Sequence, residues 1–312
     1  MACLSFFGMA AAGLLGGGLN ASGQITEVVE HLENAAAKKI VQIDVKGVLM
    51  DGDGPGLARG VAQSATRMLK QSLKDPRVAG VLLVLDTPGG SVTASDIMYD
   101  YLQRLRKAGK PVVVLMGDLC ASGGYYVAAG ADAIYAHPTT VTGSIGVMIN
   151  SISVHDLMNR YGVQDQSIVS GANKQILSMT KHLTDEQKAL LQSIVDELYM
   201  RFVNIIAQGR KLEVNAVKSV ADGRIMTAQT ALKNGLVDAI GYREDAMKKL
   251  ETLAGVGPFN VIRYGQPSSV WDVLSGMVKQ PAQSRALLPA LGYEGRALYL
   301  HGGLQTLIGV SH

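Results

Sequence analysis

Two glycine-rich turns contain the residues whose types and spacing fit catalytic chemistry. One is Pro-Gly-Gly at 88–90, and the other is Ala-Ser-Gly-Gly at 121–124. Adjacent glycines let backbone N–H groups point outward with no Cβ in the way, as an oxyanion hole requires. Ser122 is predicted to begin a helix of small residues, where free N–H groups and the helix dipole favour negative charge. The pattern indicates a nucleophile at Ser122, with oxyanion donors at Gly89, Gly90 and Gly123.

A serine nucleophile needs a base, and the residues alone leave its identity open. Among the six histidines, His137 is interpreted as a turn residue, and His155 is next to Asp156 in sequence, which does not make a triad. A Ser–His–Asp site is the less favoured alternative. The other candidate is a lysine in an apolar pocket, where desolvation lowers the pKa and frees the amine. Lys174 lies in an otherwise uncharged stretch, but spacing alone does not select it from 29 basic residues.

The elements around these turns alternate between strands and helices. Strands are predicted at 40–45, 81–85, 111–116 and 133–136, and helices at 24–38, 61–74, 93–108, 154–161, 185–208 and 227–233. This alternation predicts an α/β fold. Both glycine turns follow buried strands, so both are expected at the carboxyl edge of one parallel sheet. The strongest helix prediction is 185–208, with a capping box at Thr184 and Gln187 and an end at Gly209.

The composition is that of a globular protein and argues against nucleic-acid binding. Of 312 residues, 47% are hydrophobic and 18% charged, whereas aromatics are only 5% and the net charge is +3. Neither an aromatic platform for bases nor a phosphate-binding surface is expected. The two cysteines, Cys3 and Cys120, are not expected to pair, and no Cys/His run has the spacing of a zinc site.

The chain begins with an apolar segment at 3–19 that carries no charge. It is marginal for a span of about 20 residues and lacks the basic start of a secretory signal. It is interpreted as an anchor or signal, with an arm that packs on the protein or a partner as the alternative. We divide the chain into this N-terminal segment (1–22), a peptidase-like domain (23–257) and a C-terminal extension (258–312) that packs on the domain or a neighbouring subunit.

An ordered set of motifs identifies a resemblance. Its members are Asp-Thr-Pro-Gly-Gly (86–90), Ala-Ser-Gly-Gly-Tyr-Tyr (121–126), Thr-Gly-Ser-Ile-Gly-Val (142–147), Ser-Gly-Ala-Asn-Lys (170–174), Ala-Asp-Gly-Arg (221–224) and Gly-Leu-Val-Asp (235–238). In this order and spacing, between residue 40 and about residue 241, they resemble the signal peptide peptidase A family of serine peptidases, peptidase family S49, in its short form.

The resemblance implies a crotonase-like (Clp protease-like) βα superhelix and a Ser–Lys dyad. It assigns Ser122 as nucleophile, Lys174 as base and Ser144 as the residue that orients the lysine, with oxyanion donors from Gly89 and Gly90. Related Clp-type proteases place a histidine about 25 residues after the serine, where this chain has Val147. That difference favours the lysine.

The resemblance also implies the partners and the location. No metal or organic cofactor is expected. Extended, mainly apolar peptides such as released signal peptides are the expected substrates. A ring-like homo-oligomer is implied, with Lys174 reaching Ser122 of a neighbouring subunit as one arrangement. Membrane association with an extracytoplasmic catalytic domain is expected, and the cytoplasm is the alternative.

The chain departs from the family's sequence pattern at one place, and two other functions are alternatives. The family's Ser-Pro-x-Arg run after the lysine is absent from 177–181, which puts substrate preference in doubt. The first rival is a crotonase-type acyl-CoA hydratase or isomerase, which would need paired acidic residues. The second is a non-catalytic scaffold of the same fold, in a membrane complex or a phage head.

Overall fold

The computed structural model describes residues 26–31, 38–52, 60–255, 259–265 and 298–300. The apolar N-terminal segment at 3–19, predicted as an anchor, a signal or a packing segment, lies outside these residues. Most of the C-terminal extension also lies outside them. Among the residues described, no helix is both long and apolar enough to span a bilayer.

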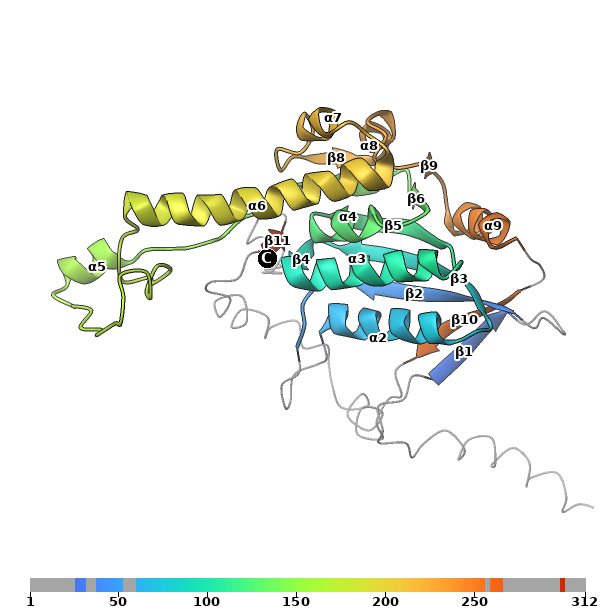
Figure 1. Cartoon of the computed structure of the whole chain (residues 1–312), viewed down its shortest axis with the longest axis horizontal. Coiled ribbons are helices and arrows are strands. Elements are labelled where there is room, and N and C mark those ends of the chain that lie inside the picture. Colours follow the sequence, from blue (N-terminus) through green and yellow to red (C-terminus); the bar gives the residue numbers. More distant parts are fainter. Residues whose placement is uncertain (1–25, 32–37, 53–59, 256–258, 266–297, 301–312) are drawn as a thin grey trace, which may run out of the picture.

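A mixed sheet forms the centre of the molecule (Figure 1). Its strands in spatial order are β1 (Thr26–His31), β10 (Asn260–Gly265), β2 (Lys39–Lys46), β3 (Val78–Thr87), β5 (Val112–Ala121), β6 (Ala133–Ala136) and β9 (Ala239–Ile240). From β10 to β9 every neighbouring pair is parallel, whereas β1 pairs antiparallel with β10. The short β7 (Val141–Gly143) leaves this path, pairing with the end of β5 and with β8 (Ile225–Thr227). The predicted α/β fold is confirmed.

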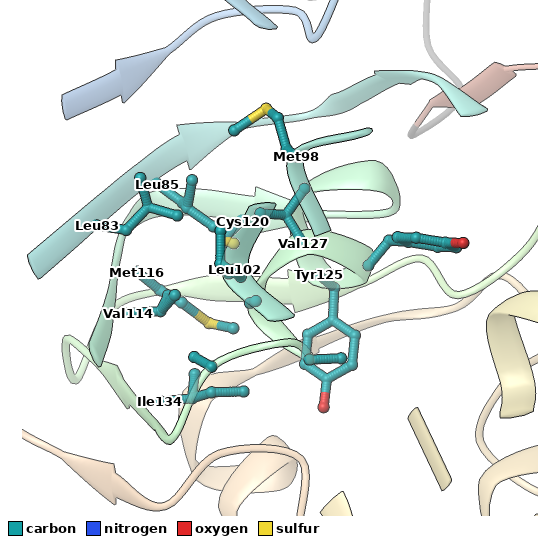
Figure 2. Close-up of a cluster of buried hydrophobic side chains, with 14 of the residues drawn as sticks. Leu83, Leu85, Met98, Leu102, Val114, Met116, Cys120, Tyr125, Val127 and Ile134 are labelled. Atoms are coloured by element: carbon teal, nitrogen blue, oxygen red, sulfur yellow. The ribbon is translucent and has the colours of Figure 1, made fainter. Parts of the chain in front are cut away.

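Helices cover both faces of the sheet. The helices in the described part of the chain are α2 (Val61–Lys74), α3 (Val92–Lys107), α4 (Gly123–Ala128), α5 (His155–Arg160), α6 (Asp185–Arg210), α7 (Val214–Lys218), α8 (Ala228–Lys233) and α9 (Arg243–Ala254). Alternate side chains of the central strands point to opposite faces. Leu83 and Leu85 join the larger core under α2, α3 and α4, whereas Leu82 joins a smaller core with Leu250 of α9. Figure 2 shows side chains of β3, β5, α3 and α4 meeting in the larger core.

Two helix predictions need correction. The stretch predicted as a helix at 24–38 contains the strand β1, whose partner β10 lies more than 200 residues later in the chain. Helix α6 does not end at Gly209 but continues to Arg210, and Lys211 adopts the left-handed conformation after it. A Cβ at Gly209 would lie 2.0 Å from the carbonyl oxygen of Ala129. This glycine therefore permits close packing against the end of α4.

The segment from 149 to 197, which we call the arm, extends away from the sheet (Figure 1). It contains α5 and the first half of α6, and none of its residues is buried. The second half of α6 returns to the core through buried residues that begin at Phe202. The capping box predicted for this helix is confirmed, because Thr184 and Gln187 bond reciprocally. The arm is thus anchored to the body at one end of a long helix.

Candidate active site

Ser122 occupies a strained backbone position between β5 and α4. Its φ and ψ are 54° and −116°, a region that costs non-glycine residues of the order of 1–3 kcal/mol. The chain is held there because Ser122 N–H donates to the Gly143 carbonyl at 2.8 Å and the Ser122 carbonyl accepts from Tyr126 N–H at 2.9 Å. The backbone on both sides of the serine is therefore fixed.

The Ser122 hydroxyl is fully buried and has no hydrogen-bond partner within the described part of the chain. The side chain does not cap α4, although Ser122 is its N-cap residue. Leaving such a group unpaired costs about 1–3 kcal/mol, so a purely structural serine would be expected to bond. Backbone strain and an unsatisfied hydroxyl on one residue are typical of a functional site rather than a helix cap.

The Pro-Gly-Gly turn lies beside Ser122, as predicted. Thr87 at the end of β3 pairs with Cys120 at the end of β5, two residues before the serine. Gly90 has φ +159°, and a Cβ there would lie 2.1 Å from the carbonyl oxygen of Leu49. The turn is fastened because Leu49 N–H donates to the Gly89 carbonyl at 2.8 Å.

The three predicted oxyanion donors differ in availability. Gly89 N–H already donates to the Thr87 hydroxyl at 3.1 Å. Gly123 is the first residue of α4, where backbone N–H groups have no acceptor within the helix. Leu49 bonds to Gly89 and Ser91, on either side of Gly90. Gly123 therefore fits an oxyanion hole better than Gly89 does.

An extended segment already pairs with the turn. Residues Leu298–Leu300 form β11, which is antiparallel to β4 (Gly89–Ser91) and places Tyr299 opposite Gly90. The edge of β4 therefore accepts a chain in β conformation. No pattern in the sequence predicts this pairing, because three apolar residues near a chain end carry no strand signal of their own.

Ser144 lies on the other side of Ser122. It follows Gly143, whose carbonyl holds Ser122, and its φ of 51° is fixed by an N–H bond to the Arg224 carbonyl at 2.7 Å. Its side chain is nearly buried and lines a cavity of about 510 Å³ together with Val147, Tyr199 and Asp222. Arg224 forms an ion pair with Asp222, which lines the cavity.

The two tyrosines after Ser122 anchor α4. Tyr125 is fully buried and donates its hydroxyl to the Leu236 carbonyl at 2.7 Å, and burial raises its pKa well above the ordinary value. Tyr126 donates to Asp96 at 2.5 Å, and its ring packs 5.0 Å from that of Phe202 on α6. Both act in packing, and they hold the first turn of α4 in place.

Lys174 is not brought to Ser122 within one chain. It lies exposed in a turn of the arm, next to the start of α6, where Gln187 bonds to the Ala172 carbonyl at 3.1 Å. From Gln187 to Phe202, the first buried residue of α6, the helix rises about 22 Å at 1.5 Å per residue. Consistent with this separation, the Ser122 hydroxyl has no bonding partner.

Comparison with known proteins identifies the family. Residues 104–257 match the model of peptidase family S49. The chain is 36% identical over 301 residues to a proposed signal peptide peptidase SppA of Enterococcus faecium, covering 91% of this chain and 86% of that protein. It is 34% identical to Protease 4 of Salmonella typhi, covering 80% of this chain and 41% of that longer protein. It is also 31% identical to the chloroplastic serine protease SPPA of Arabidopsis thaliana, covering 75% of this chain and 34% of that protein.

All three relatives are named as proteases, which favours proteolysis over the acyl-CoA and scaffold alternatives. The buried serine in its strained turn is consistent with that chemistry. From the extent of these similarities, the chain belongs to peptidase family S49 and is a serine-type endopeptidase that acts on peptides.

Proposed function

We propose that the chain cleaves apolar peptides with Ser122 as nucleophile and with Lys174 of a neighbouring copy as base. The observation that carries this proposal is the buried Ser122 hydroxyl without a partner, set between the Gly89–Ser91 strand and Ser144. Within the described part of one chain, the proposed site has a nucleophile, oxyanion donors and a positioning serine, but no base.

The proposed reaction proceeds through an acyl-enzyme. Neutral Lys174 removes the proton from the Ser122 hydroxyl, whose oxygen attacks the peptide carbonyl. The N–H groups of Gly123 and of the Gly89–Gly90 turn stabilise the oxyanion. The protonated lysine then donates to the leaving amine, and water releases the acyl group. Ser144 bonds to the lysine amine and orients it.

The surface of the arm supports association with a second copy. Of the 14 exposed large hydrophobic residues in the described part of the chain, eight lie in the arm: Ile152, Leu157, Tyr161, Val163, Ile168, Val169, Leu190 and Ile194. Exposed apolar residues gathered in one segment mark an interaction surface. An arm that docks on the body of the next copy would repeat head to tail, and such contacts form a ring when the rotation between copies closes. We therefore propose a ring-like homo-oligomer.

The substrate class follows from the edge of β4 and from the relatives. Pairing of β11 with β4 shows that this edge accepts an extended antiparallel chain, the mode in which peptides add to a sheet. The name of the Enterococcus relative is that of a signal peptide peptidase. Apolar peptides such as released signal peptides are the proposed substrates.

The proposal also includes the type of α/β architecture and the cellular location. The parallel order from β2 to β9, with β7 paired to the end of β5 beside Ser122, supports a crotonase-like (Clp protease-like) βα superhelix. We propose three parts of the chain: an N-terminal segment (1–22), a peptidase-like domain (23–257) and a C-terminal extension (258–312). Membrane association with an extracytoplasmic catalytic domain is supported by the apolar segment at 3–19 and by the name of the Enterococcus relative.

Covalent labelling tests the nucleophile. A fluorophosphonate probe is expected to modify Ser122, located by mass spectrometry after digestion. Ser122→Ala should lose both labelling and peptide turnover. Ser193→Ala is the matched control, because this hydroxyl lies exposed on α6 and bonds only to the Leu190 carbonyl. An adduct on another residue, or turnover that survives Ser122→Ala, would contradict the proposal.

A further inference from the structure

A compact group of metal-ligating side chains lies in the arm, outside the proposed active site. It consists of His155 and Asp156 at the start of α5 and His182 before α6. The Asp156 carboxylate lies 3.1 Å from Nδ1 of His155 and 2.9 Å from Nε2 of His182. The two imidazole rings lie 4.5 Å apart between centroids. Two imidazole nitrogens and a carboxylate oxygen thus converge on one point of the surface.

The spacing fits a small tetrahedral ion. Zinc binds nitrogen and oxygen ligands at about 2.0–2.1 Å, so ligand atoms on its tetrahedron are about 3.3 Å apart. Both nitrogen-to-carboxylate distances are within about 0.5 Å of that value, and all the candidate ligand atoms lie within 4.8 Å of one another. Small side-chain rotations would therefore complete three protein ligands. The imidazole and carboxylate donor set suits zinc among the common divalent ions.

The position of the group suggests what an ion would do there. His155 and Asp156 belong to α5, whereas His182 belongs to the segment that leads into α6, 26 residues further along the chain. The arm has no buried residues, so little apolar burial holds these two segments together. Exposed hydrogen bonds and ion pairs each contribute little to stability. A metal bond between the segments would be a much stronger tie.

We propose that His155, Asp156 and His182 bind one Zn²⁺, which ties α5 to the segment before α6. The ligands are between one-third and four-fifths exposed, so the ion can enter from solvent. Three protein ligands leave a fourth position for water. This site stabilises the arm and takes no part in peptide hydrolysis, so it does not depend on the assignment of Ser122 or Lys174.

Metal titration tests this proposal. The full chain, purified without a histidine tag and treated with chelator, is titrated with Zn²⁺ in a calorimeter. One ion per chain is expected to bind with micromolar or tighter affinity. His155→Ala and His182→Ala should each weaken binding by more than about tenfold. His137→Gln is the matched control, because it removes one imidazole on another part of the fold, beside Tyr242.

A structural readout separates this site from adventitious binding. Hydrogen exchange of residues 155–160 and 178–184 should slow when Zn²⁺ is added to the wild-type chain, and should not change in His182→Ala. Ser122→Ala should bind Zn²⁺ as the wild type does. The proposal is overturned if the wild type binds no ion at micromolar concentration, if both histidine variants bind equally well, or if exchange in the arm is insensitive to the metal.

Discussion

Ser122 has two energetically unfavourable features, a positive φ and a buried hydroxyl without a partner in the described residues, and its neighbours hold both in place. The positive φ and the unpaired hydroxyl persist because bonds from Gly143 and Tyr126 fix the backbone on both sides of the serine. Strain of this kind survives only where neighbouring packing over-determines the conformation. The contact between α4 and the end of β3 is close, and it can be tested by substitution.

Gly124→Ala is expected to destabilise the fold by about 1–3 kcal/mol, because the new Cβ would lie 2.6 Å from Cγ2 of Thr87. Equilibrium unfolding in urea measures the change. Gly171→Ala is the matched control, because a Cβ there has no atom within 4 Å, and its effect should stay within about 0.5 kcal/mol. Equal stability of the two variants would show that α4 is not tightly held.

Ser144→Ala tests the positioning role at the same scale. If Ser144 orients the lysine, the variant should lower kcat by up to about 100-fold and leave KM nearly unchanged. The rate of fluorophosphonate labelling at Ser122 should fall in proportion. Ser144 also lines the cavity beside the site. A rise in KM with unchanged kcat would therefore assign it to substrate binding instead.

At the scale of elements, the loop that carries Lys174 is closed by Asp165. Its carboxylate accepts hydrogen bonds from the Ser167 and Thr180 hydroxyls at 2.5 and 2.6 Å. These bonds, with the Ser167 bond the largest cause, lower the pKa of Asp165 to about 2. The bond to Thr180 joins the two ends of the segment that contains Lys174.

The closure of this loop is expected to weaken at low pH, because the pKa of Asp165 is lowered in the folded chain. A carboxyl whose pKa is lowered on folding stabilises the fold above its unfolded pKa of about 3.9. The contribution is lost as the pH falls from about 4 through 2. The protection factors of residues 166–180, which are ratios of intrinsic to observed exchange rates and so correct for the intrinsic pH dependence of amide exchange, should therefore fall over that interval. In Asp165→Asn these protection factors should already be lower at pH 6 and change less with pH, and an unchanged profile would contradict the closure.

The elements show which structure the sequence could predict and which it could not. Strands β2, β3, β5 and β6 and helices α2, α3 and α6 were predictable because apolar periodicity and capping residues are local signals. β1 was not, because its strand character depends on pairing with β10 at the far end of the chain. Gly209 was misinterpreted as a helix end, because its close contact with Ala129 is visible only in three dimensions.

Some features of the candidate site could likewise be predicted from the sequence, and others could not. The two glycine turns were predictable because strand ends of a parallel sheet meet at one edge, and the register of Thr87 with Cys120 confirms their proximity. The bond from Gly89 to Thr87 and the projection of the arm could not be predicted. Lys174 followed only from the family resemblance, because its relation to Ser122 depends on how whole subunits assemble.

At the scale of the whole molecule, subunit mixing tests the shared site. Ser122→Ala and Lys174→Ala should each be inactive alone. If the serine and the lysine come from different copies, an equal mixture that exchanges subunits should recover about a quarter of wild-type activity, because half the copies supply each partner at random. If the pair formed within one chain, the mixture would stay inactive. Light scattering on each variant and on the mixture confirms that assembly is unchanged.

Ser122 lies in the body and Lys174 lies in the arm. In the proposed assembly, each subunit therefore contributes to two catalytic centres. A copy that lacks both residues would silence its own serine and also the serine that its arm should serve. If a tenth of the copies were defective in this way, about a fifth of the centres would be lost. A loss-of-function allele of this protease would therefore behave as dominant-negative when expressed beside the normal one.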